Sequence, residues 1–415
     1  MASIQDKIYE KKVSDKWVNT HYVQEVCRHF LFGYTIYKKK FKQTIPIGCY
    51  CLVYNISIAG LISLLLTHTL DGQQLFDTIH YMLYMIVLDA YVYTIFKYRR
   101  KMLELNAKLD EWFHYKELEQ EALIIREKVE AKASRNVNIY VGIMLSCNFL
   151  FCVMPMMKLS FASDRSDMLN FLIYPCYLGF PLDTWWGFAL TYAFEIVCST
   201  ATFSLYARLT SYGFVTSMHV NYQLKLLRVA LQTLEIRSVS IMERLGFSMQ
   251  SPLWKKRYER TLEEEINTIA IHLQYLHGLS DYIVQILTPA TTSTYTGGMW
   301  IVCFSGLVMY TAENESMLIG KFFVIFSAEL MNVYTFSLTS EYLITSFEET
   351  INSIYFCPWY NLPKTCTKTL LNMMTLLMKV PSLRTIVGYK ANIVNMGAIL
   401  NASYTYFSLI IATKS

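Results

Sequence analysis

Three acidic residues lie inside otherwise uncharged apolar runs, where an ionisable side chain is costly and often serves a function. They are Asp89 in the run 78–96, Glu195 in 184–207 and Glu329 in 322–340. One interpretation is structural pairing with a neighbouring polar group, and the other is a ligand or ion site. The three acids do not form the ladder of a proton relay, so both interpretations stay open.

Motifs for enzymatic chemistry do not occur in the sequence. It has no HExxH, P-loop or GxSxG motif, and its dispersed histidines and cysteines lack the spacing of metal ligands. The net charge of +5 is mild. The sequence therefore predicts neither an enzyme nor a metal ion or other cofactor, and we expect no nucleic-acid partner.

The last apolar run carries a polar stripe. On a helix of 3.6 residues per turn, one face holds Asn401, Thr405, Ser408 and Ala412. The other faces hold Tyr404, Phe407, Ile410 and Ile411. A helix surrounded by lipid has no use for such a stripe, whereas a helix that lines water does. This pattern favours a water-lining helix.

Aromatic residues and methionines gather toward one end of several other runs. Two interpretations apply: core packing with an interfacial aromatic belt, or an apolar pocket for a small ligand. From the residues alone, packing is the stronger interpretation. The pocket interpretation rests on Tyr81, Tyr84, Met85, Phe151, Met154, Trp186, Tyr192, Phe322 and Phe326.

The composition of the chain predicts that the acids, the polar stripe and the aromatic residues are carried by membrane-spanning helices. Of the 415 residues, 53% are hydrophobic and only 17% are charged, against about 25% in a typical soluble domain. Because a span needs about 20 apolar residues, the sequence predicts an all-α protein with seven transmembrane helices. The spans are expected within 43–70, 78–96, 136–157, 184–207, 282–312, 322–340 and 391–413.

The positions of basic residues predict the orientation. All but four of the 37 lysines and arginines lie before residue 43 or within 97–135, 208–281 and 341–390. Cytoplasmic connections carry such an excess, so we expect the N-terminus inside and the C-terminus outside. A G-protein-coupled receptor has the opposite orientation. A secondary transporter is disfavoured because paired Gly/Pro-broken helices and an inverted repeat are lacking.

The spans and connections divide the chain into six parts. The long basic connections have apolar residues at helical spacing, so we expect helices that continue the spans into the cytoplasm and meet other subunits there. The parts are a cytoplasmic N-terminal segment (1–43), spans one to four with the pocket (44–213), a cytoplasmic helical connection (214–281), spans five and six (282–340), a cytoplasmic anchor region (341–390) and the last span (391–413).

The C-terminal part resembles the insect odorant receptor family. The resemblance rests on "YFCPW" at 355–359, the break at Pro381 and the terminal "SYTYFSLI". It implies an odorant-receptor channel fold with cytoplasmic anchor helices, in which four subunits form a ligand-gated, non-selective cation channel lined by the last span. Leu409, two places after "TYF", matches the family's gate, and apolar rings close pores by dewetting.

The same resemblance distinguishes branches of the family. Ala412 stands where the co-receptor has a pore glutamine, and the 208–281 connection lacks the co-receptor's enlargement. The gustatory branch has Gln-Phe where Ala412-Thr413 stands here. The resemblance therefore implies a ligand-tuning odorant receptor subunit. A self-sufficient homotetrameric gustatory- or odorant-type channel is the alternative.

The resemblance also implies partners and location. The partners are a co-receptor subunit, a small volatile odorant that binds from outside, membrane lipids, and monovalent and divalent cations. Tyr84 or Tyr192 would orient the odorant by a hydrogen bond. The location is the plasma membrane, as a multi-pass protein in the dendrite of a sensory neuron. The sequon at Asn314 is a candidate glycosylation site in an outside loop.

Overall fold

A computed structural model describes residues 44–67, 72–109, 115–161, 168–173, 176–247, 253–311 and 316–414. The N-terminal segment 1–43 and the sequon at Asn314 lie outside these ranges. The described residues form α-helices joined by short turns and 3-10 helices, with a single isolated β-bridge between Arg384 and Lys390. The α-helices are α3 (Thr44–Thr67), α4 (Gly72–Leu109), α5 (Glu119–Phe161), α6 (Trp185–Gln232), α7 (Leu234–Arg244), α8 (Trp254–Thr311), α9 (Ser316–Tyr355), α10 (Lys364–Leu377) and α11 (Ile393–Lys414).

The all-α prediction is confirmed, and each predicted span falls on a different long helix. In chain order these helices are α3, α4, α5, α6, α8, α9 and α11. By length and composition, four helices among the described residues can cross a membrane: α4, α5, α6 and α9. Helices α8 and α11 carry many hydroxyl and amide side chains.

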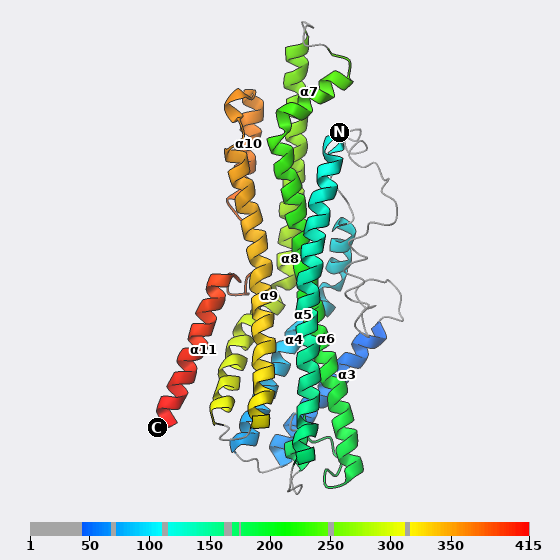
Figure 1. Cartoon of the computed structure of the whole chain (residues 1–415), viewed down its shortest axis with the longest axis vertical. Helices are drawn as coiled ribbons and strands as arrows, with labels where there is room; N and C mark the ends of the chain where they lie inside the picture. Colours follow the sequence, from blue (N-terminus) through cyan, green and yellow to red (C-terminus); the bar gives the residue numbers. More distant parts are fainter. Residues whose placement is uncertain are drawn as a thin grey trace.

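Several helices are much longer than a membrane is thick. Helix α6 has 48 residues and α8 has 58, which correspond to about 72 Å and 87 Å against a hydrocarbon core of about 30 Å. The predicted boundaries at 213 and 281 fall inside these helices, which continue without a break. At one end of the bundle, α6 and α8 extend to α7, and α9 extends to α10 (Figure 1). We call these extensions the stems.

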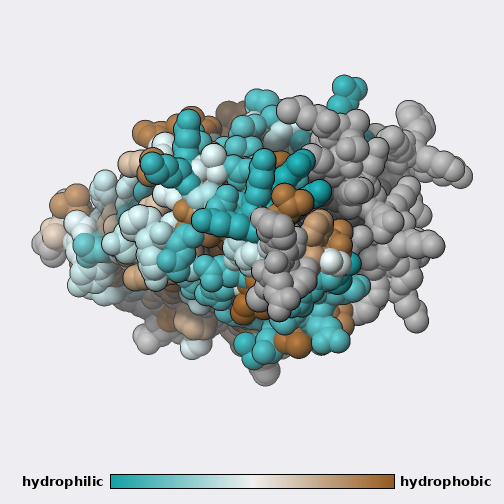
Figure 2. Space-filling view, turned by 90° about the horizontal axis from the view of Figure 1, so that it is seen from above, coloured by the Kyte–Doolittle hydropathy of each residue, from teal (hydrophilic) through white to brown (hydrophobic). Residues whose placement is uncertain are grey.

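The stem end has a hydrophilic surface. Seen along the long axis, hydrophilic side chains cover most of the end where α7 and α10 lie, with scattered apolar ones between them (Figure 2). A chain segment that leaves the bilayer must present polar groups to water, so this surface fits stems that stand in an aqueous compartment.

Helices α4, α6, α8 and α9 pack closely at the centre of the bundle. Two glycines of α8 lie close to neighbouring helices. A Cβ on Gly297 would lie 2.1 Å from Val87 Cγ2 of α4, and one on Gly298 would lie 2.8 Å from Glu329 Oε1 of α9. A side chain at either position would therefore require its neighbour to shift, so glycine favours the close packing of these helices.

A buried amide connects five helices in this core. Asn332 of α9 donates to the Tyr91 hydroxyl of α4 at 2.8 Å, and Tyr91 also bonds Thr294 of α8 at 2.8 Å. The Asn332 carbonyl oxygen accepts from Thr210 of α6 at 2.9 Å and from Tyr140 of α5 at 3.3 Å. Polar groups buried in a membrane bundle need such partners, and this network holds the helices in one register.

Candidate functional site

The predicted pocket residues meet in an aromatic cluster between α4, α5 and α6. The rings of Tyr81 and Phe151 lie 6.3 Å apart, and Phe151 lies 6.2 Å from Phe203 of α6. Tyr84 stacks on Tyr206 of α6 with ring centroids 5.4 Å apart. Three helices thus contribute to one apolar, aromatic region.

Helix α9 closes this region from the other side. Phe322 is fully buried and packs edge-on against His80 of α4 at 5.1 Å. Met154 of α5 reaches α9 at Gly320, where a Cβ would lie 3.3 Å from its sulfur. The Tyr192 hydroxyl donates to the Cys152 carbonyl oxygen and so joins α6 to α5.

The other predicted pocket residues differ in their surroundings. Met85 is buried in the core beside this region, and Phe326 is half-buried. Trp186 is 79% exposed at the start of α6, away from the cluster and in keeping with an interfacial belt. The cluster is therefore built by α4, α5, α6 and α9, and Trp186 is not part of it.

A loop segment covers the cluster at the end where α6 begins. The Tyr81 hydroxyl donates to the Ile173 carbonyl oxygen at 3.1 Å, and the Ile173 N–H donates to Glu195 Oε2 at 2.8 Å. Ile173 and Glu195 are both fully buried. Glu195 thus anchors the loop, which favours the structural interpretation of this acid. Sequence reasoning gave no signal for this contact, because the residues lie 22 positions apart in different elements.

The other two intramembrane acids differ from one another. Glu329 is 1% exposed beside Gly298, and its Oε1 has no hydrogen-bond partner among the described residues. Asp89 is exposed on α4. An unsatisfied buried oxygen is costly, so the structural and functional interpretations of Glu329 both stay open.

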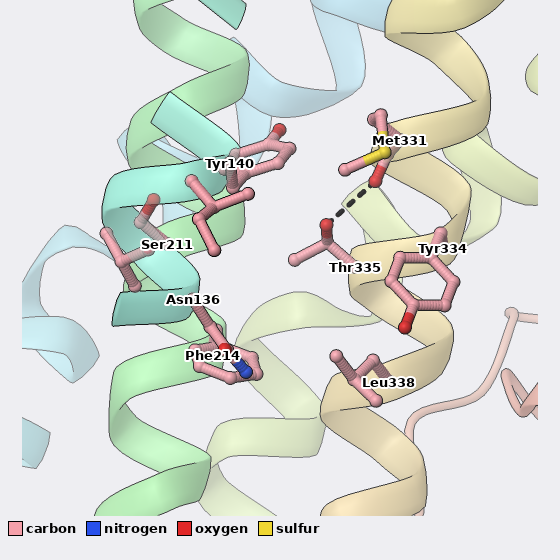
Figure 3. A pocket seen from close by; sticks show the side chains of 10 residues that line it. Asn136, Tyr140, Ser211, Phe214, Met331, Tyr334, Thr335 and Leu338 are labelled. Atoms are coloured by element: carbon pink, nitrogen blue, oxygen red, sulfur yellow. Dashed lines mark hydrogen bonds between the residues drawn. The ribbon is translucent and has the colours of Figure 1, made fainter. Parts of the chain in front are cut away.

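A cavity that the sequence did not predict lies between α5, α6 and α9. Its volume is about 210 Å³ (Figure 3). Buried side chains such as Tyr140, Ser211 and Phe214 form its inner wall, and Met331 and Thr335 line it from α9. None of the nine predicted pocket residues lines it. It escapes sequence analysis because its polar members are spread over three helices without a shared spacing.

Helix α11 contacts the bundle with one face only. Ser403 donates to the Met299 carbonyl oxygen of α8 at 3.1 Å, and the Tyr406 ring stacks on Trp300 at 5.3 Å. Phe407 packs edge-on against Tyr310 at 5.9 Å. Helix α11 therefore lies along the edge of the bundle beside the end of α8 (Figure 1).

The predicted polar stripe lies on the uncovered face of α11. Asn401, Thr405 and Ala412 are exposed, Ser408 is half-buried, and Leu409 is 60% exposed. Leu409 lies about 80° from Asn401 around the helix axis, at the edge of the same face. The structure thus keeps the five predicted pore residues on one side of α11, and four of them are exposed.

Comparisons with known proteins agree with this architecture. The family model described as 7tm odorant receptor matches residues 71–404. The structure is similar to the insect olfactory receptor OR5 from Machilis hrabei in complex with eugenol, with a TM-score of 0.75, 10% identity and coverage of 95% of this chain and 97% of that chain. A second structure of that receptor matches with a TM-score of 0.73, 12% identity and coverage of 94% and 97%. Among curated proteins, the sequence finds no match.

Proposed function

Because the chain belongs to the 7tm odorant receptor family, we propose that it is the ligand-tuning subunit of a tetrameric, ligand-gated, non-selective cation channel. The family comprises receptors rather than enzymes, so the polar side chains serve recognition and conduction. The partner in the tetramer is an odorant-receptor co-receptor subunit. The assembly acts in the plasma membrane of a sensory neuron dendrite.

The uncovered face of α11 is the observation that carries this proposal. Hydrocarbon cannot satisfy amide and hydroxyl groups, so a membrane helix turns them toward protein or water. The α8 contacts of α11 use Ser403, Tyr406 and Phe407, which leaves Asn401 and Thr405 exposed in the single chain. Four such faces around a common axis enclose a water-filled path, and a ring of Leu409 side chains closes it by dewetting.

The aromatic cluster is the proposed odorant site. The similar receptor OR5 from Machilis hrabei was solved in complex with eugenol, which supports a small, mainly apolar ligand here. Burial of apolar surface at about 25 cal/mol per Å² supplies most of the affinity. Tyr84 or Tyr192 adds a hydrogen bond that orients the ligand. The ligand must bind the open state more tightly, since equal affinity for both states shifts nothing.

The proposed orientation places the stems in the cytoplasm and the C-terminus outside. Its support is the concentration of Lys and Arg in the parts of the chain that form the stems, together with their hydrophilic surface (Figure 2). The aromatic cluster then lies toward the outside, where a volatile ligand arrives.

Whole-cell current tests this function. Cells would express this chain alone, a co-receptor alone, or both, under a panel of volatile esters, alcohols and aldehydes. Ligand-evoked, non-selective cation current is expected only when both subunits are present. Current from this chain alone would identify the alternative, a self-sufficient homotetrameric channel. Surface expression of both subunits without evoked current to any of these ligands would count against the proposal.

A further inference from the structure

The cavity between α5, α6 and α9 is bordered by exposed side chains of two predicted spans, which face lipid when the bundle stands in a membrane. Ile139 of α5 is 54% exposed and Tyr334 of α9 is 40% exposed, and both line the cavity. The inner wall, in contrast, is buried. An apolar cavity of about 150 Å³ can hold a benzene molecule, so the 210 Å³ found here can hold part of a hydrocarbon chain that enters between the two helices.

Polar groups line the cavity as well as apolar ones. Asn136 contributes an amide from α5. Ser211 is 2% exposed, and its Oγ has no hydrogen-bond partner among the described residues. A buried hydroxyl without a partner is costly, and a ligand oxygen in the cavity would remove that cost. The cavity therefore suits a ligand that carries oxygen atoms near an apolar chain.

Basic residues stand at the stem side of the cavity. Lys132 lies one turn before Asn136 on the same face of α5, and Arg135 lies one turn before Ile139. The Lys132 ammonium lies 4.5 Å from the ring centroid of Tyr342, which packs on the cavity residue Phe214 at 5.9 Å. The positive charge of Lys132 is thus connected to the cavity wall through the Tyr342 ring, which contacts both Lys132 and Phe214.

Two further cations extend this basic surface along the stem. Arg228 of α6 pairs with Glu349 at 2.7 Å. Burial lowers the pKa of Lys225, the neighbouring Arg228 and Lys132 lower it further, and Glu349 raises it. Lys225 thus lies near two other cations, Lys132 and Arg228, and one acid, Glu349, so an added anion would stabilise this group of cations.

We propose that this cavity binds an anionic phospholipid, with its phosphate at Lys132 and Arg135, its ester groups near Asn136 and Ser211, and an acyl chain between α5 and α9. A phospholipid matches the sequence of groups along α5: charge at the membrane surface, polar groups beneath it, and an apolar cavity deeper in the bilayer. In the proposed orientation the lipid comes from the cytoplasmic leaflet. The site does not overlap the aromatic cluster, so this inference stands apart from the proposed odorant site.

Lipid retention by the purified full chain tests the site. The chain would be extracted, exchanged with dihexanoyl phosphatidylserine, dihexanoyl phosphatidylcholine or inorganic phosphate, and examined by native mass spectrometry and by titration. Phosphatidylserine is expected to bind more tightly than phosphatidylcholine, and inorganic phosphate alone is expected to bind only weakly. Equal affinity for the two lipids would overturn the proposal, and so would phosphate binding as tight as that of phosphatidylserine.

Variants locate the two parts of the site. Lys132→Gln should weaken phosphatidylserine binding about fivefold, whereas Lys256→Gln, at the start of α8, should leave it unchanged. Thr335→Phe fills the cavity and should reduce retention of either lipid. Leu145→Phe adds the same ring on the exposed, lipid-facing side of α5 and serves as its control.

The variants also decide between lipid and odorant as the occupant. Among the described residues, Thr335 donates a hydrogen bond only within its own helix, to the Met331 carbonyl oxygen at 2.7 Å, so its replacement breaks no hydrogen bond between helices. If Thr335→Phe shifts the odorant response while phosphatidylserine retention stays unchanged, the cavity serves a small ligand and the lipid proposal is wrong. If Thr335→Phe does not fold, unchanged binding by Lys132→Gln would by itself overturn the proposal.

Discussion

Tyr84 is the predicted pocket residue best placed to act on a ligand. It is half-buried on α4, and its ring stacks on Tyr206 in the middle of the aromatic cluster. We expect Tyr84→Ala to raise the half-maximal odorant concentration about tenfold, because it removes buried aromatic surface and a hydroxyl. Dose–response curves of the assembled channel measure this shift.

Tyr93→Ala is the matched control for Tyr84→Ala, since Tyr93 lies on the same helix and is exposed. Its dose response should equal that of the parent. If Tyr84→Ala instead loses surface expression while any surviving current keeps the parental sensitivity, Tyr84 serves packing rather than ligand binding.

Asn332 is expected to matter for stability more than any ligand contact. Its amide satisfies hydroxyls from three other helices. Asn332→Leu removes these bonds and leaves buried hydroxyls unpaired, so the free energy of unfolding should fall by about 2 kcal/mol. Thermal unfolding in detergent measures the loss. The control is Asn138→Leu on the exposed side of α5, which should unfold like the parent.

At the scale of the element, α11 is the helix whose exposed face carries the proposed pore. Leu409 is exposed on that face, so Leu409→Ala should leave folding intact. It should also widen the constriction that the four Leu409 side chains of the proposed tetramer form. We expect a larger leak current without ligand and altered ion permeation in the assembled channel. The control is Leu66→Ala on the exposed side of α3. Unchanged leak and permeation would place the gate at another residue or on the partner subunits.

The stems contain two buried histidines that resist protonation. Burial lowers the pKa of His219 to about 3, with a smaller effect from Arg126, and burial likewise lowers the pKa of His272 to about 3. Both groups have an ordinary pKa of 6.5. The unfolded chain therefore binds more protons between pH 3 and 6.5, and folding becomes less favourable as the pH falls through this range.

The expected stability profile is flat above pH 6.5 and falls below it, as measured by unfolding temperature in detergent. His219→Phe keeps a ring next to Tyr222, which packs edge-on against His219 at 6.1 Å, and should flatten the slope. A parental profile that rises or stays level as the pH falls toward 4 would contradict the prediction.

At the scale of the whole molecule, the single chain leaves large apolar side chains exposed where the stems end. Phe356 is 80% exposed and Tyr360 is 73% exposed, between α9 and α10. We expect this cluster of exposed aromatic residues to contact another subunit, because large exposed apolar patches often serve as interaction sites. Phe356→Ser should therefore reduce co-purification with the co-receptor several-fold without lowering the unfolding temperature of this chain.

Ile236→Ser is the comparison for Phe356→Ser, because Ile236 of α7 is similarly exposed on the same end of the molecule but lies outside the exposed aromatic segment of Tyr355, Phe356, Trp359 and Tyr360. It should leave co-purification unchanged. Equal loss in both variants would point to general insolubility, and no loss with Phe356→Ser would place the subunit interface elsewhere.

The sequence by itself determined the helices and the composition of their faces. Apolar runs and the 3.6-residue period are local properties, so each of the seven runs forms a helix where predicted, and the stripe from Asn401 to Ala412 stays on one face. Lys and Arg counts likewise gave an orientation, which stays a prediction. The helical spacing of the connections also predicted that helices continue the spans beyond the bilayer, as α6 and α8 do. The residues at which these helices end were not predicted, because tertiary packing decides them.

Only the tertiary structure decided which side chains from different helices meet. Three features depend on the axial offset between neighbouring helices: the hydrogen bond from Ile173 to Glu195, the Asn332 network and the cavity beside Ser211. That offset is fixed by close packing, such as α8 against Glu329 at Gly298. Nothing in a single chain's local pattern encodes these distances, because the contacts join residues that lie tens to hundreds of positions apart.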